Sequence, residues 1–181
     1  ALIGCGGRGT GLATSFAGRD DTQITHVCDL LDSRLEGSSR AIARHQHGKV
    51  PKKLKRVEDL LEEKDLDAVI IGTPDHWHTP LAIMACQAGK DVYVEKPFSH
   101  NMFEGRMLVK AARKHKSIVQ VGTQNRSAPY NLAALEYIRS GKLGDIHLAK
   151  IYNLRAGGPY RLGNSQPQPK GFDWGCELPK R

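Results

Sequence analysis

A lysine directly after a hydrophobic run is the residue of this sequence best suited to acid–base chemistry. Lys96 follows the apolar residues 92–94, beside Glu95 and before Pro97. Pro97 restricts the backbone of the turn, and a positioned lysine amine can accept or deliver a proton at a substrate hydroxyl or carbonyl group. We therefore predict that Lys96 is catalytic and contacts the substrate. The alternative is a structural Glu95–Lys96 pair at the surface.

A glycine-rich segment offers a second kind of chemistry, the binding of phosphate groups. Residues 4–9, Gly-Cys-Gly-Gly-Arg-Gly, fit the pattern G-x-G-x-x-G between an apolar run and a helical stretch. In a βαβ unit Gly4 permits the tight turn, Gly6 lets the backbone approach a pyrophosphate and Gly9 allows close helix–strand packing. The phosphates then bind at the positive end of the helix. The segment predicts a dinucleotide site, with a purely structural glycine turn as the alternative.

An acidic residue stands where a dinucleotide-binding unit places its ribose ligand. Asp29 follows Gly9 by 20 residues, at the end of the second expected strand, which is the spacing of the carboxylate that binds a ribose hydroxyl. A carboxylate there repels a 2′-phosphate, so we expect NAD as the cofactor. Arg34 is close enough in sequence to weaken this preference, which keeps NADP as an alternative. Asp29 can also serve as the N-cap of the following helix.

Distinctive polar segments follow all five expected strands. In an open α/β sheet, ligands bind beyond the carboxyl ends of the strands. The segments found there are residues 4–9, Asp29, 73–78, 95–97 and 122–126. The opposite ends carry ordinary helix stops. This asymmetry predicts one functional edge of the sheet, with Arg126 as a candidate substrate ligand.

Residues 73–78, Thr-Pro-Asp-His-Trp-His, include two histidines that resemble metal ligands. The i, i+2 spacing of His76 and His78 before a helix does not place both on one helical face, and no further ligand cluster accompanies them. We therefore expect no metal. Instead, we expect Trp77 beside the nicotinamide and His78 near the substrate, with simple packing as the alternative for Trp77.

Short apolar runs alternate with helical stretches along most of the chain. We expect strands over 1–3, 23–28, 68–71, 92–94 and 118–121, and helices over 10–17, 32–45, 57–63, 79–88 and 101–115. Thr79 and Gly89 are the expected start and stop signals of the helix 79–88. Such alternation predicts an α/β fold with βαβ units and a doubly wound, Rossmann-type parallel sheet.

The pattern changes after a further expected helix over 129–139. Gly141 and Gly144 indicate a turn, and residues 145–154 alternate between apolar and polar as a half-exposed antiparallel strand does. We predict a dinucleotide-binding domain over 1–144 and the truncated start of a second α/β domain, with an open antiparallel sheet, over 145–181.

The composition narrows the classes of partner. Of the 181 residues, 39% are hydrophobic and 25% are charged, as in globular proteins. No window approaches the run of about 18 apolar residues of a membrane span, so we expect no membrane partner. The net charge is +8, but aromatic residues make up 6% and none lies among the basic clusters at 49–56 and 110–116. We therefore expect no nucleic-acid partner. The four cysteines are far apart and indicate neither a zinc site nor disulfides.

Together these motifs resemble the Gfo/Idh/MocA family, the group of glucose–fructose oxidoreductase and inositol dehydrogenase. The resemblance covers essentially the whole chain and is carried by residues 4–9, 28–29, 72–78, 95–97 and 121–124. The Glu-Lys-Pro motif is its most specific part. The resemblance implies an N-terminal Rossmann domain, bound NAD or NADP, and oxidation or reduction of sugars, cyclitols or related polyols.

Roles for individual residues follow from the resemblance. It implies that Asp29 binds the adenosine ribose, that Glu95 and Lys96 reach the nicotinamide and the substrate, and that Gln124 closes the cleft. The residues implied to hold the pyrophosphate are Gly4, Gly6, Gly7, Arg8 and Gly9, and those implied to line the cofactor are Thr73, Pro74 and His76. The family also uses an Asp and a His of the second domain, which no segment of this chain matches.

Two other functions use the same cofactor half. One is a glycosidase that retains NAD and oxidises its sugar transiently; the other is a non-catalytic NAD(H)-sensing module. We expect a carbohydrate or polyol substrate and a homo-oligomer formed through the second domain. The sequence begins at Ala1 inside a strand-like run, so we expect residues upstream. Free cysteines favour the cytoplasm, with periplasmic export as the alternative if a leader peptide was lost.

Overall fold

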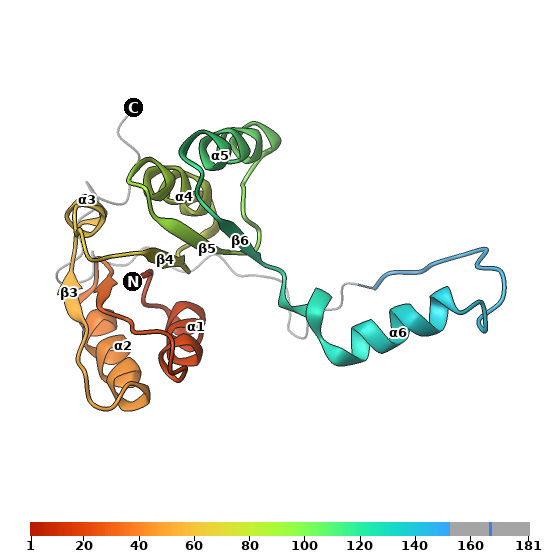
Figure 1. The fold of residues 1–181 in the computed structure, drawn as a ribbon, viewed down its shortest axis with the longest axis horizontal. Coiled ribbons are helices and arrows are strands. Elements are labelled where there is room, and N and C mark those ends of the chain that lie inside the picture. The colour runs from red at the N-terminus through yellow and green to blue at the C-terminus, as the bar shows by residue number, and fades with distance from the viewer. Residues whose placement is uncertain (153–166, 168–181) are drawn as a thin grey trace. The chain divides into compact units, whose positions relative to one another are not determined.

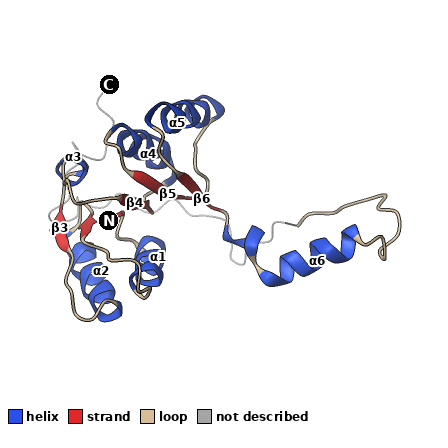
Figure 2. Cartoon of the chain, viewed as in Figure 1, coloured by secondary structure: helices blue, strands red, loops and turns tan. Residues whose placement is uncertain are grey.

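The computed structural model describes residues 1–152 and residue 167. Its first compact unit, over residues 1–122, is a parallel sheet with helices on both faces (Figure 1, Figure 2). The sheet has six strands in the order β3-β2-β1-β4-β5-β6, and every neighbouring pair is parallel. The strands are β1 (Leu2–Ile3), β2 (His26–Cys28), β3 (Lys52–Leu54), β4 (Ala68–Ile71), β5 (Asp91–Glu95) and β6 (Val119–Gly122). This confirms the predicted doubly wound fold.

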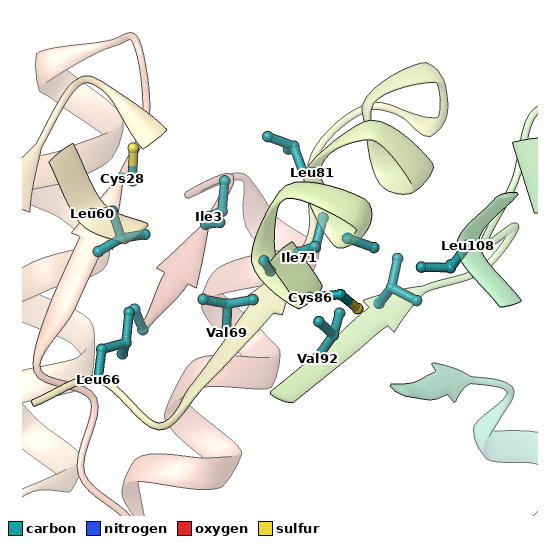
Figure 3. Packing of buried hydrophobic residues seen from close by; sticks show 14 residues of the cluster. Ile3, Cys28, Leu60, Leu66, Val69, Ile71, Leu81, Cys86, Val92 and Leu108 are labelled. Atoms are coloured by element: carbon teal, nitrogen blue, oxygen red, sulfur yellow. The ribbon is translucent and has the colours of Figure 1, made fainter. Parts of the chain in front are cut away.

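The helices lie in two layers because successive strand residues face opposite sides of the sheet. Leu2 packs in the cluster beneath α1 and α2, whereas Ile3 packs in the cluster beneath α3, α4 and α5. In the cluster that contains Ile3, strand side chains such as Val92 pack with Leu81 and Leu108 of the covering helices (Figure 3). The helices are α1 (Gly7–Ala17), α2 (Asp32–His45), α3 (Val57–Leu61), α4 (His78–Gln87), α5 (Met102–His115) and the short 3₁₀ helix η1 (Asp75–Trp77).

The strand order reverses between β1 and β4. The two strands are parallel, so the chain leaves both of them at the same edge of the sheet. β1 pairs with β2 on one side and with β4 on the other. Ligands of open α/β sheets bind at such a switch point, beyond the carboxyl ends of the strands. The loops that follow β1, β2, β4 and β5 therefore form the edge on which the candidate residues were predicted.

Several element boundaries differ from the prediction. Helix α1 begins at Gly7 rather than at residue 10, with Gly6 as its N-cap in an extended conformation. Helix α4 begins at His78, so Thr79 is not its cap; its hydroxyl donates to the Phe98 carbonyl instead. Gly89 does end this helix, with a φ of +72°. The edge strand β3 was not predicted, because Lys52 and Lys53 are exposed and show no apolar pattern.

The second compact unit contains η2 (Gln124–Ser127) and helix α6 (Pro129–Arg139). The glycines of the predicted turn, Gly141 and Gly144, both have positive φ. The strand expected over 145–154 is wrong as far as residue 152, because no described residue forms a ladder with this segment and a strand requires a hydrogen-bonded neighbour. Residues 153 and 154 lie outside the described part. The domain boundary at Gly144 stays a prediction. None of the helices in the described residues has the length and apolarity of a membrane span.

Candidate active site

The glycine loop after β1 is held in close contact with the loop after β4. A Cβ built on Gly9 would overlap the carbonyl oxygen of Gly4, and one built on Gly72 would lie 2.8 Å from Gly9 Cα. Gly4 has a φ of +90°, a conformation that side chains rarely adopt, and its N–H donates to the Cys28 carbonyl at 2.9 Å. The turn and close packing predicted for Gly4 and Gly9 are therefore present, and Gly72 shares in them.

The middle of the loop is open instead. A Cβ built on Gly6 or on Gly7 would meet nothing within 4 Å. Gly6 caps α1 without a side-chain hydrogen bond, and the first helix N–H groups of an α-helix have no partner within the helix. Room for close approach to the backbone at the positive end of a helix is what a pyrophosphate requires.

Asp29 ties the end of β2 to the glycine loop. One carboxylate oxygen accepts from the Cys5 N–H at 2.8 Å, and the other accepts from the Leu31 N–H at 3.0 Å. The N-cap of α2 is Leu31, so Asp29 is not the cap of that helix. Each carboxylate oxygen can accept a further hydrogen bond, and Asp29 is partly exposed. The carboxylate can therefore receive the hydroxyls of a ribose that lies beside the loop.

Glu95 and Arg8 link the loops after β5 and β1. Their side chains form an ion pair of 2.6 Å, in which Glu95 is 4% exposed and Arg8 is 54% exposed. The Arg8 guanidinium therefore faces solvent at the edge of the sheet while it neutralises a buried carboxylate. This pairing raises the pKa of Arg8 further. An exposed guanidinium beside the open glycines is suited to a phosphate oxygen.

Lys96 lies directly beyond the strand end, as predicted. It is exposed, its N–H donates to Glu95 Oε2 at 3.3 Å, and the Lys96–Pro97 peptide is cis. The sequence suggested an ion pair between the neighbours Glu95 and Lys96. In the structure, Glu95 forms its ion pair with the distant Arg8. The exposed amine and the buried carboxylate thus occupy the same strand end.

His78 differs most from its predicted role. The ring is 1% exposed, with Nδ1 at 2.6 Å from the Pro97 carbonyl oxygen and Nε2 at 2.9 Å from that of Thr73. A ring so placed does not offer a nitrogen to a substrate. Trp77 packs against the hydrophobic cluster, which agrees with the alternative that it is a packing residue. Its ring is tilted against that of the exposed His76.

The loop after β4 contains one buried hydroxyl without a partner. Thr73 Oγ1 is inaccessible to solvent and makes no hydrogen bond in the described structure. Buried hydroxyls are normally hydrogen-bonded, so this orphan is an exception to the rule. Pro74, the next residue, is exposed. Both stand at the switch point, where a cofactor was expected to lie.

Comparison with known proteins decides the family. A sequence model described as an oxidoreductase family with an NAD-binding Rossmann fold, GFO_IDH_MocA, matches residues 1–123. The chain belongs to the Gfo/Idh/MocA oxidoreductase family.

Individual relatives show how far the similarity extends. A glycosyl hydrolase family 109 protein of Shewanella pealeana is 31% identical over 164 residues, which cover 85% of this chain and 35% of that protein. An inositol 2-dehydrogenase of Rhizobium meliloti is 27% identical over 171 residues, which cover 88% and 49%. The chain spans 25% to 36% of the length of the first three curated relatives that it matches.

Solved structures share the same fold. An NAD-binding protein from Listeria innocua superposes with a TM-score of 0.69 at 26% identity, over 80% of this chain and 40% of the other. A scyllo-inositol dehydrogenase from Lactobacillus casei, with bound NAD(H) and scyllo-inositol, superposes with a TM-score of 0.70 at 23% identity, over 80% and 41%. The second likeness bears on the fold alone.

The residues of this Gfo/Idh/MocA chain fit a dinucleotide. The space beside Gly6 and Gly7 and the exposed Arg8 suit a pyrophosphate, and the partly exposed Asp29 carboxylate suits a ribose hydroxyl. These positions surround one switch point. A hollow of about 340 Å³ lies at the opposite edge, lined by residues such as Arg19 and His45. This hollow is remote from the loops after β1, β2 and β4, so it is not the site at which we expect the cofactor.

Gln124 and Arg126 lie in the second compact unit. Both are exposed on η2, and Arg126 N–H donates to the Thr123 carbonyl at 3.0 Å. Their roles in closing the cleft and in binding substrate stay predictions. Within the described residues no group of three His, Cys, Asp or Glu side chains is arranged to hold a metal ion.

Two supporting residues were missed by the sequence analysis. The Thr10 hydroxyl lies 3.2 Å from the Cys5 carbonyl, to which it donates, and 3.1 Å from Ser38 Oγ. Ser38 is 2% exposed and comes from α2. Together they hold the glycine loop from the side of the helices. A hydroxyl on the buried face of an expected helix is the only signal that the sequence gives for Ser38.

The cysteines beside the loop are expected to be inert. Burial, with the Asp29 carboxylate as a second cause, raises the pKa of Cys5 to about 12, and burial raises that of Cys28 to about 12 as well. At about pH 8 a thiol alkylates through its thiolate, so both should react about a thousandfold more slowly in the folded protein than in urea. Iodoacetamide labelling followed by peptide mass analysis measures this ratio. Comparable rates in the two states would contradict the buried placement.

Proposed function

We propose that the protein containing this chain transfers a hydride between a sugar, cyclitol or related polyol and NAD, with Lys96 in the proton relay. The observation that carries the proposal is the position of Lys96. It follows β5 at the sheet edge that also bears Asp29 and the open glycine loop. Family membership supports oxidoreductase chemistry at this edge. The relative named inositol 2-dehydrogenase supports a polyol as substrate.

When bound, NAD would supply the hydride acceptor, while residues of this chain would hold the cofactor and exchange the proton. The N–H groups after Gly6 and the Arg8 guanidinium hold the pyrophosphate, while Asp29 accepts hydrogen bonds from the ribose. Oxidation of a secondary alcohol removes a hydride from carbon and a proton from oxygen. The Lys96 amine, in its neutral form, takes that proton, and the ammonium returns it in the reverse direction.

The cofactor half of the proposal is tested by calorimetric titration of the full-length protein with NAD and NADP. Asp29→Asn should weaken NAD binding about tenfold or more, because a charge-assisted hydrogen bond to the ribose is lost. The same variant should bind NADP relatively better, since the carboxylate no longer repels a 2′-phosphate.

Asp32→Asn is the matched control. Asp32 carries the same charge in the first turn of α2 but is exposed and pairs with Lys55 at 3.0 Å. Its removal should leave both affinities unchanged. Equal effects of the two variants, or NAD binding that survives Asp29→Asn in a folded protein, would refute the ribose site.

A second candidate function is a glycosidase that retains NAD. The observation in its favour is the similarity to proteins named glycosyl hydrolase family 109, at 31% identity over 85% of this chain. In such an enzyme a transient oxidation of the sugar permits elimination of the glycosidic bond, and the cofactor is regenerated in each cycle. Reduced NAD that accumulates in step with product indicates a dehydrogenase. Product without net reduction of NAD indicates the glycosidase.

A further inference from the structure

A buried histidine joins the two loops that leave neighbouring strands at the active edge. His78 is the first residue of α4, and its ring contacts the Thr73 carbonyl beyond β4 and the Pro97 carbonyl beyond β5. Strands β4 and β5 are paired up to Ile71 and Val94, just before these loops begin. The ring therefore spans the two loops where the hydrogen bonds of the sheet no longer hold them together.

The next residue of the helix extends the same contact. Thr79, also 1% exposed, donates its hydroxyl to the Phe98 carbonyl at 2.9 Å. Consecutive side chains at the start of α4 thus bind consecutive carbonyls of the segment directly after Lys96. Helix α5 encloses this segment from another side, since a Cβ on Gly105 would lie 3.0 Å from Ser99 Oγ and 3.3 Å from the ring of Phe98.

Lys96 is therefore fixed at its backbone and exposed at its side chain. On one side it follows Glu95, which the Arg8 ion pair and the Lys96 N–H hold. On the other side it precedes the carbonyls bound by His78 and Thr79. An apolar residue at either position of α4 would leave the backbone carbonyls that His78 and Thr79 now contact without these hydrogen bonds. The polar contacts therefore tie the segment directly after Lys96 to the start of α4.

We propose that His78 and Thr79 are positioning residues for Lys96. They hold the Pro97 and Phe98 carbonyls against the start of α4, and thereby set the place from which the Lys96 amine exchanges its proton with the substrate. The proposal rests on the proposed function, in which Lys96 relays that proton. Loss of either contact lowers the rate of the chemical step and leaves dinucleotide binding intact.

The test uses the full-length protein with NAD and the polyol that it oxidises. Thr79→Val is nearly isosteric and removes only the donor to Phe98; His78→Leu removes both ring contacts. Each should lower kcat about tenfold to a hundredfold, the cost of a misplaced catalytic group, with the Kd for NAD unchanged within about twofold. Thr79→Ser keeps the hydroxyl and should restore kcat.

Gln46→Met is the matched control for buried hydrogen bonds in general. Gln46 is 5% exposed and bonds to Ile24 and Lys49 near the opposite edge of the sheet. Its loss should leave kcat unchanged even if it lowers the melting temperature. Equal falls of kcat in Gln46→Met and Thr79→Val, a wild-type kcat in Thr79→Val, or a failure of Thr79→Ser to restore kcat would overturn the positioning role.

A Lys96→Ala variant in the same assay separates the two hypotheses. If Lys96→Ala keeps its kcat, the proton relay itself is wrong and the positioning role falls with it. If Lys96→Ala is inactive while Thr79→Val and His78→Leu turn over as the wild type does, the proposed function stands and the positioning role alone is refuted.

Discussion

Replacing Gly9 by alanine is expected to destabilise the domain by about 3 kcal/mol or more. The added methyl group would overlap the carbonyl oxygen of Gly4, and the loop after β4 prevents a retreat because Gly72 lies against Gly9 from that side. Backbone atoms, unlike the tip of a flexible side chain, yield only when the strand–helix packing itself shifts. Urea unfolding followed by circular dichroism measures the loss.

Gly6→Ala is the control for this substitution within the same loop. Gly6 has an ordinary extended conformation, with φ −67° and ψ 174°, and a Cβ there meets nothing within 4 Å. The variant should unfold within about 0.5 kcal/mol of the wild type. It should nevertheless bind NAD more weakly, since the methyl group would occupy the space through which a pyrophosphate approaches the backbone. A stable Gly9→Ala protein, or Gly6→Ala with full NAD affinity, would contradict the geometry of the loop.

The contrast between these two glycines shows what the sequence could predict. The G-x-G-x-x-G pattern located the loop and assigned the roles of Gly4, Gly6 and Gly9 from general principles, and the structure has the packing predicted for Gly4 and Gly9. It contained no sign of Gly72, which comes from a segment far along the chain and packs against Gly9. Contacts of this kind depend on which strands become neighbours in the sheet, and the hydrophobic periodicity of the sequence does not predict the strand order.

The same limit explains the other differences. Strand β4 is apolar and central, so its run was evident, whereas β3 lies at the edge of the sheet and carries exposed lysines. Charged residues are typical of edge strands, because they discourage pairing with other chains. Arg8 and Glu95 are 87 residues apart and were identified separately as cofactor residues. Their ion pair depends on β1 and β5 both flanking β4, and spacing alone does not show it.

His78 follows β4 at the carboxyl edge of the sheet, as predicted, but its ring is buried between two carbonyl oxygens and does not face outward as the predicted substrate role requires. The sequence showed a polar residue after a strand, at the edge where ligands of open α/β sheets bind. Burial decides the matter, because a ring that is 1% exposed between two carbonyls is occupied by the protein. His78 is the first residue of α4, and its burial depends on how the start of that helix packs against the loops after β4 and β5, which the sequence pattern does not show.

Replacing Lys96 by alanine is expected to lower kcat/KM for polyol oxidation by about a hundredfold to ten-thousandfold, the usual contribution of a positioned acid or base. Binding of NAD should change little, because the residues suited to the pyrophosphate and the ribose, Arg8 and Asp29, have their own partners in Glu95 and the backbone. Steady-state kinetics and calorimetric titration of the same preparation measure the two quantities.

Lys96→Arg distinguishes proton transfer from simple charge. Arginine keeps a cation at this position but does not give up its proton, so this variant should be nearly as inactive as Lys96→Ala. Recovery of activity in Lys96→Arg would instead indicate that the charge orients the substrate and that another group moves the proton. Full activity in Lys96→Ala would remove Lys96 from the chemistry altogether. Since a module that only senses NAD(H) has no evident use for an amine at this strand end, a selective loss of turnover with intact NAD binding is the result that separates an enzyme from a sensor.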